Sequence, residues 1–234
     1  MVGCRGAGRS PRLLHPLFFL DNWGLRDDPV LDGLVAAAAV IARRDRALGR
    51  VIATVGPPDL WPPHDSAFAA LVRSIAFQQL AGRAAAAIHG RFIAALDGDC
   101  TPAAVLALPE PAFRAAGLSG AKAASVRDLA AKVADGAVPL DEIDALSDDE
   151  VVERLSRVRG IGRWTAEMFL IFQLRRPDVW PVDDLGVRKG YALAHRLAEV
   201  PRPRELLVLG EAYRPHRTVA AWYCWRAVET VLPR

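Results

Sequence analysis

The chain has 234 residues, 52% of them hydrophobic and 24% charged, which is enough for a packed core in one large domain or two small lobes. No apolar stretch approaches the length that crosses a bilayer, so a spanning helix is excluded. Cys4, Cys100 and Cys224 lie far apart and exclude a disulfide framework, a CxxC zinc site and a four-cysteine iron–sulfur cluster. This cysteine usage fits a reducing compartment.

The net charge of +3 is unevenly distributed. Residues 151–234 hold 15 Lys or Arg against 9 Asp or Glu, whereas residues 1–150 hold 15 against 18. Arginine supplies 27 of the 30 basic residues, as the bias of a GC-rich genome would. The alternative is that the C-terminal part faces a polyanion.

The first 30 residues differ from the rest of the chain. They combine a basic segment, MVGCRGAGRSPR, with the short apolar run LLHPLFFL. A signal peptide would have a longer apolar run without His15 and Pro16, followed by small residues for cleavage. We therefore expect residues 1–30 to be a poorly ordered or non-native arm, residues 31–234 to form the functional domain, and the protein to be cytoplasmic.

From about residue 30 the apolar residues recur at helical spacing. The pattern indicates helices over about 68–75, 88–96, 119–133, 147–155, 164–174, 184–197 and 216–232. Ser119 is placed to cap one of them, and Ser147 with Glu150 forms a capping box for another. Alternating strand patterns are nearly absent, so the predicted fold is all-α.

Residues 155–165 predict a hairpin between two helices. A helix ends near Val158, Arg159-Gly160-Ile161-Gly162 forms a turn, and a second helix follows. The free amides at the start of that helix would bind a phosphate without reading a base. The same turn also occurs in helix pairs that bind no nucleic acid, so the turn alone does not decide.

A pair of carboxylates, Asp183 and Asp184, opens a later helix 19 and 20 residues beyond Trp164. For Asp183 we favour the role of an N-cap and helper acid. A carboxylate beside a DNA-binding hairpin would stabilise developing positive charge or activate water.

These segments resemble the helix-hairpin-helix DNA glycosylases, and among them the DNA-3-methyladenine glycosylase II family. The resemblance rests on V-R-G-I-G-R-W-T-A followed by R-P-D-V-W-P-V-D-D-L-G-V-R-K-G. The segments at 71–80 (L-V-R-S-I-A-F-Q-Q-L), 117–122 (G-L-S-G-A-K) and 214–226 (R-P-H-R-T-V-A-A-W-Y-C-W-R) also match. The resemblance implies two helical lobes with an active-site cleft between them.

The resemblance also assigns roles to individual residues. It implies that Asp184 is catalytic and stabilises an oxocarbenium-like sugar or activates water. Bifunctional relatives carry a lysine at the position of Trp164, so we expect a monofunctional enzyme that leaves an abasic site. The predicted base pocket consists of Trp164, Met168 and Trp222, where Met168 replaces the aromatic residue of many relatives. For Trp225 we favour ordinary core packing.

Contacts to DNA follow from the same alignment of motifs. Gln78 and Gln79 lie where the family inserts a side chain into the gap left by the flipped base. The predicted DNA-binding residues of the hairpin are Arg159, Gly160, Ile161, Gly162, Arg163 and Thr165. Relatives carry a serine at the position of Ala81, so the following helix lacks a capping hydroxyl.

No cofactor is expected to be required. The resemblance implies a structural Na⁺ or K⁺ bound by backbone carbonyls of Ser156, Val158 and Ile161. The expected partner is double-stranded DNA with alkylated bases, bound by a monomer, with no membrane partner. Two alternatives stay open: a glycosylase of this fold for another damaged base, and a non-catalytic DNA-binding module.

Overall fold

The computed structural model describes residues 29–60 and 66–230, and within these ranges it contains helices and no strand. The prediction of an all-α fold is therefore confirmed. The predicted arm, residues 1–30, lies almost wholly outside the described residues. Among the residues described, no helix has both the length and the apolar character needed to cross a membrane.

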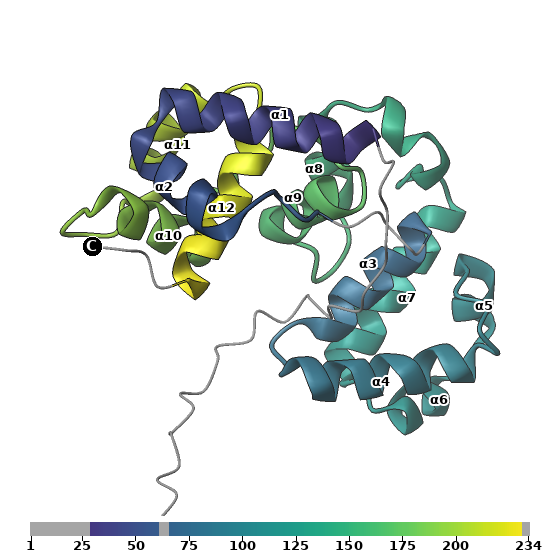
Figure 1. Cartoon of the computed structure of the whole chain (residues 1–234). Helices are drawn as coiled ribbons and strands as arrows, with labels where there is room; N and C mark the ends of the chain where they lie inside the picture. Colours follow the sequence, from purple (N-terminus) through teal and green to yellow (C-terminus); the bar gives the residue numbers. More distant parts are fainter. Residues whose placement is uncertain (1–28, 61–65, 231–234) are drawn as a thin grey trace, which may run out of the picture.

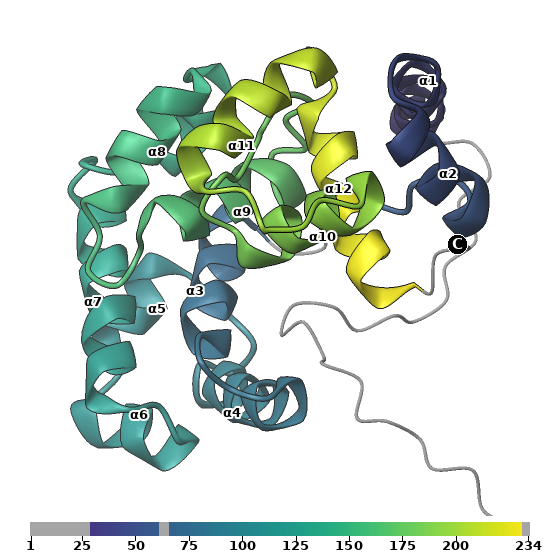
Figure 2. The same cartoon turned by 90° about the vertical axis from the view of Figure 1, so that its left-hand side faces the viewer.

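The helices form two groups in space, which we call the two lobes (Figures 1 and 2). One group packs α3, α4, α5, α6 and α7 together, and these helices span Ala67–Phe77, Gly82–Ala95, Pro102–Ala107, Glu110–Ala116 and Gly120–Ala134. The other packs helices from the two ends of the chain: α1, Pro29–Arg44; α2, Arg46–Val55; α10, Leu185–His195; α11, Pro203–Leu209; the 3₁₀ helix η2, Gly210–Tyr213; and α12, Arg217–Glu229.

A helical hairpin lies between the two groups. It consists of α8 (Asp148–Ser156) and α9 (Arg163–Phe172), preceded by the 3₁₀ helix η1 (Leu140–Ala145). Helix α9 packs against α8 and also contacts α3. Phe172 of α9 also stacks on Trp225 of α12. The hairpin therefore joins the two groups of helices, at the position where the sequence predicted it.

The helix starts follow the predicted capping chemistry. Ser119 accepts a hydrogen bond from the amide of Lys122, and Ser147 and Glu150 form the predicted capping box. Ala81 precedes α4 with no side-chain cap, which confirms that this helix lacks a capping hydroxyl. Local sequence therefore determines where α7 and α8 begin.

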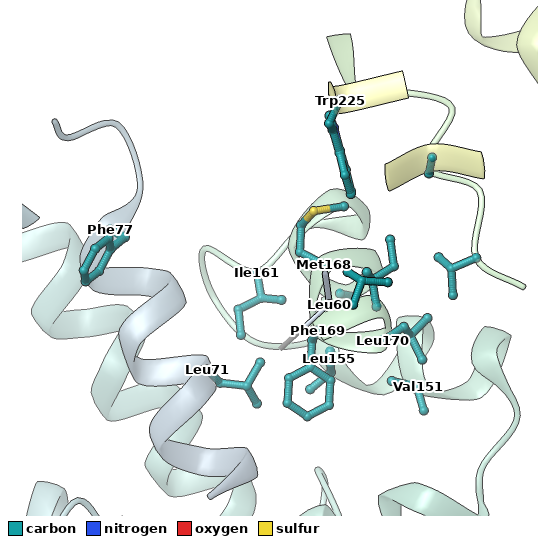
Figure 3. Close-up of a cluster of buried hydrophobic side chains, with 14 of the residues drawn as sticks. Leu60, Leu71, Phe77, Val151, Leu155, Ile161, Met168, Phe169, Leu170 and Trp225 are labelled. Carbon is teal, nitrogen blue, oxygen red and sulfur yellow. The ribbon is translucent and has the colours of Figure 1, made fainter. Parts of the chain in front are cut away.

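The core surrounds α9, in which the seven consecutive residues 165–171 are buried. Figure 3 shows Phe169 on the side of α9 that faces Leu71 of α3 and Leu155 of α8. Met168 and Trp225 lie at the opposite edge of this cluster. Burial of this apolar area holds the hairpin rigidly between the lobes.

Candidate active site

The hairpin turn exposes most of its residues to solvent and is anchored to the core by one buried side chain. Arg159, Gly160 and Gly162 are exposed, whereas the Ile161 side chain is buried in the core. Gly160 has a φ of +77°, and a Cβ there would lie 2.6 Å from Ser125 Oγ, so the position requires glycine for two reasons. Gly162 precedes α9 without a side-chain cap, which leaves the first amides of the helix open to an anion.

Asp184 is the N-cap of α10, and only 4% of its surface is exposed. Its Oδ1 accepts hydrogen bonds from Val187 N at 2.8 Å and from Trp225 Nε1 at 2.9 Å. Its Oδ2 accepts one from Trp164 Nε1 at 2.7 Å. Three N–H donors thus fix the carboxylate and link it to the first turn of α9, beside the hairpin.

The neighbouring acid, Asp183, is exposed. We favoured Asp183 as the N-cap from the sequence, and that assignment was wrong, because the side chain of Asp184 bonds the helix amide. The Asp184 carboxylate therefore both caps α10 and accepts hydrogen bonds from the indoles of Trp164 and Trp225.

Helix α12 brings Trp225 to the site. Its indole stacks on Phe172 with 5.8 Å between ring centroids and donates a hydrogen bond to Asp184. A Cβ at Gly186 would lie 2.8 Å from Trp225 Cδ1 and 3.0 Å from Asp184 Oδ1, so glycine makes room for this contact. The predicted core packing of Trp225 is confirmed, but its hydrogen bond to Asp184 was missed. Gly186 was also missed, although it directly follows the Asp-Asp-Leu motif.

The predicted pocket residues lie in different environments. Trp164 is half-buried at the edge of the core, and Met168 is buried one turn further along α9. Trp222 packs edge-on against Tyr223 and beneath the Arg226 guanidinium, and none of the hydrogen bonds to Asp184 described above comes from it. Of the two tryptophans of α12, Trp225 rather than Trp222 contacts the carboxylate.

The predicted gap-filling residues lie next to the hairpin. Gln78 ends α3, and its Nε2 donates a hydrogen bond to the Gly160 carbonyl at 2.9 Å. Gln79 follows with a φ of +56°, in the left-handed region that non-glycine residues rarely occupy. The structure therefore brings together two segments that lie about 80 residues apart in sequence. The remaining hairpin prediction, Thr165, is buried in α9.

Comparisons with known proteins agree with this geometry. The profile of the HhH-GPD superfamily of base excision DNA repair proteins matches residues 72–213. The chain belongs to this superfamily. The DNA-3-methyladenine glycosylase 1 of Schizosaccharomyces pombe is 36% identical to this HhH-GPD chain over 204 residues, which cover 85% of this chain and 90% of that protein.

Solved structures of HhH-GPD proteins have the same fold. The structure of the S. pombe 3-methyladenine DNA glycosylase in complex with abasic DNA aligns with a TM-score of 0.72 at 37% identity, over 81% of this chain and 95% of that one. The DNA-3-methyladenine glycosidase of Bacillus halodurans aligns with a TM-score of 0.75 at 34% identity, over 83% of this chain and 89% of that one.

Sequence reasoning missed a second buried carboxylate in this HhH-GPD protein. Glu167 is 4% exposed; its Oε1 accepts a hydrogen bond from Arg163 Nε at 2.9 Å, and its Oε2 is buried without a partner. Burial raises the pKa of Glu167 to about 7, the Arg163 guanidinium opposes this shift, and the charges of Asp183 and Asp184 add to it. The sequence signal was an acid within the apolar run WTAEMFLIF.

The predicted cation site of the HhH-GPD hairpin rests on main-chain oxygens. Among the residues described, no group of three His, Cys, Asp or Glu side chains could hold a metal. The Val158 carbonyl accepts a hydrogen bond from Ile161 N at 3.1 Å, and its second lone pair remains compatible with a weakly held cation. The one cavity described, about 570 Å³ and lined in part by Asp45, Tyr191 and Tyr213, lies at the other end of α10 from Asp184.

Proposed function

We propose that this chain is a monofunctional DNA glycosylase that flips alkylated purines of the 3-methyladenine and 7-methylguanine type out of the duplex and hydrolyses their N-glycosidic bond, leaving an abasic site in base excision repair. The observation that carries the proposal is the buried Asp184 carboxylate, which two indole N–H groups and one amide hold beside the hairpin. The relatives named as 3-methyladenine glycosylases support it.

The chemistry requires a fixed negative charge near a sugar. When the purine departs with the electrons of the N-glycosidic bond, positive charge develops on the sugar, and water then adds to the anomeric carbon. A carboxylate in a site of low dielectric stabilises that charge far more strongly than one in water. Asp184 is pre-oriented for this role because both oxygens are already held by donors.

Within residues 29–60 and 66–230, no lysine has a place in the proposed site from which it would attack the sugar. Trp164 stands where bifunctional relatives carry a lysine. The three lysines of the chain lie elsewhere: Lys122 bonds main-chain carbonyls, Lys132 pairs with Asp128, and Lys189 is exposed on α10. Without a Schiff base the enzyme does not cut the strand.

Indole rings favour a cationic base. N-alkylation gives the purine a positive charge, weakens its pairing and makes it a good leaving group. The half-buried face of Trp164 supplies a cation–π surface beside Asp184. The exposed hairpin amides, with Arg159 and Arg163, would bind the DNA phosphates, and the hairpin carbonyls of Ser156, Val158 and Ile161 would hold a monovalent cation that strengthens this phosphate contact.

The decisive experiment replaces Asp184 with asparagine, which keeps the shape and removes the charge. We expect release of 7-methylguanine and 3-methyladenine from methylated duplex DNA to fall by about 10²–10³-fold, while binding to the duplex persists. Asp183→Asn, the matched control at an exposed neighbour, should have a much smaller effect. Full base release by Asp184→Asn would refute the catalytic assignment.

A panel of lesions tests the substrate class. We expect more base to be released from alkylated DNA than from duplexes with an oxidised or deaminated base. The strand that contains the resulting abasic site should break only after treatment with alkali. The flexible Met168 side chain in place of an aromatic one is the feature that would broaden the pocket toward other bases. Stronger release of an oxidised base would replace this proposal with the alternative substrate.

A further inference from the structure

One face of α7 contacts both segments to which DNA contacts are assigned. Lys122, Ser125, Asp128 and Lys132 follow one another at intervals of three and four residues, so they share a stripe of this helix. Helix α7 packs against α3, and its stripe reaches the hairpin turn as well. The motif G-L-S-G-A-K, which the sequence analysis matched to the family without a role, ends at the first residue of this stripe.

At one end of the stripe, Lys122 holds the last turn of α3. Its Nζ donates to the Ala76 carbonyl at 2.7 Å and to the Gln78 carbonyl at 2.8 Å. Burial lowers the pKa of this amine, because the side chain is partly removed from water. The strained residue Gln79 follows directly, so the lysine fixes the backbone from which the gap-filling side chains project.

Further along the stripe, α7 holds the hairpin. Asp128 Oδ2 accepts the Arg159 amide at 2.7 Å, and Asp128 Oδ1 pairs with Lys132 Nζ at 2.5 Å. Burial raises the pKa of Asp128, but these two donors outweigh burial and lower it. Ser125 lies against Gly160, where no Cβ would fit.

A direct contact completes the arrangement, since Gln78 Nε2 donates to the Gly160 carbonyl at 2.9 Å. The turn after α3 and the hairpin are therefore bound to the same helix and to each other. We propose that the stripe of α7 sets the spacing between these two segments, and that Lys122 and Asp128 are positioning residues for base flipping. The proposal rests on the glycosylase function proposed above and adds a role that Asp184 does not have.

The physical reason is that flipping requires both segments at once. Extruding a paired base costs a few kcal/mol of stacking and pairing, which the protein recovers by filling the gap while it holds the phosphates. A displacement of about 1 Å between the two segments separates these contacts and can cost up to about 10²-fold in rate. Loss of the stripe should therefore slow the flipping of a paired base more than bond cleavage.

The test is Lys122→Met, which keeps the aliphatic stem and removes the amine. Single-turnover release of 7-methylguanine is measured from duplexes with cytosine opposite the lesion and with a stable abasic analogue opposite it. 2-Aminopurine next to the lesion reports flipping by its fluorescence. We expect about tenfold slower release opposite cytosine, a smaller flipping signal, and a change of less than about threefold opposite the abasic analogue. Lys189→Met, which removes an exposed lysine on α10, is the matched control.

Asp128 provides a second, independent variant in case Lys122→Met does not fold. Asp128→Asn keeps an oxygen that can accept the Arg159 amide, whereas Asp128→Ala removes it. We expect Asp128→Asn to retain most of the flipping signal and Asp128→Ala to lose it. Equal losses on both duplexes, or normal flipping in Lys122→Met and Asp128→Ala, would overturn the positioning role. Absence of base release by the wild-type protein would instead contradict the proposed function.

Discussion

At the scale of single residues, Glu167 is a carboxyl group kept out of water next to the charges of Asp183 and Asp184. Its pKa is raised from 4.5 to about 7. Between these two pH values the folded protein therefore keeps a proton on Glu167 that the unfolded chain has released. The free energy of unfolding therefore contains a contribution that is complete below about pH 4.5 and is lost as the pH rises toward 7.

Glu167→Gln should remove this pH dependence. The shift corresponds to roughly 3 kcal/mol at most, since one pKa unit is about 1.4 kcal/mol. The free energy of unfolding of the variant minus that of wild type should be larger at pH 8 than at pH 5, as measured by urea unfolding at both pH values. Glu153→Gln, at an exposed ion pair on α8, should show no such gain. An equal effect of Glu167→Gln at both pH values would contradict the assigned titration.

Residue identity at the site was only partly predictable. The resemblance to the family selected Asp184 through its distance from Trp164. The sequence did not show which of the two adjacent acids caps α10, because both lie at the helix start. Trp222 and Trp225 are one helical turn apart, so the sequence placed both near the site without their contacts. Only the packing of α12 on α10, with Gly186 between, brings Trp225 to the carboxylate.

At the scale of elements, α10 and α12 approach so closely that one residue between them can have no side chain. A Cβ at Gly190 would lie 1.7 Å from the carbonyl oxygen of Cys224, and backbone atoms cannot move aside as a flexible side chain can. This contact sets the depth at which α12 presents Trp225 to Asp184.

Gly190→Ala should therefore separate the two helices. We expect a loss of about 3 kcal/mol or more in the free energy of unfolding, together with slower base release. Gly90→Ala provides a matched control in α4, where nothing lies within 4 Å of the added methyl group. That change should be neutral or slightly stabilising because alanine favours helix. Similar stability of the two variants in thermal unfolding would contradict the close approach.

The elements themselves were largely predictable. Ser119 and the Ser147–Glu150 pair signal helix starts through local hydrogen bonds, and apolar spacing signals the buried faces. The stripe of α7 was not predictable in the same way. Lys122 and Asp128 resemble ordinary surface residues until the fold places α3 and the hairpin against them.

At the scale of the whole molecule, Asp45 connects segments more than 140 residues apart. It caps α2, and its Oδ2 accepts hydrogen bonds from His195 Nε2 at 2.8 Å and Tyr213 OH at 2.5 Å. Burial raises the pKa of Asp45, but His195 and Tyr213 outweigh burial and hold it well below the ordinary range. This contribution to stability is present above the ordinary carboxyl pKa and is lost as the pH falls into the acid range.

Asp45→Asn should accordingly destabilise the protein by about 2–4 kcal/mol at pH 7, because a buried charged network loses one partner. The difference from wild type should begin to shrink below about pH 4 and be smaller at pH 3, where the wild-type carboxyl has lost part of its advantage, because its folded-state pKa lies well below the ordinary value. Asp141→Asn, at an exposed acid, serves as the control. A constant difference across this range in denaturant titrations would show that ionisation of Asp45 does not stabilise the fold.

The lobe that holds Asp184 is assembled from both ends of the chain, since α1 and α2 pack against α10 and α12. This order has a consequence during synthesis. A nascent polypeptide already has its complete hairpin when Trp225 is still untranslated, and at that stage one of the three donors to the carboxylate is missing. Helix α12 follows both the hairpin and α10 in the sequence, so Asp184 has its full set of donors only after this helix has been synthesised.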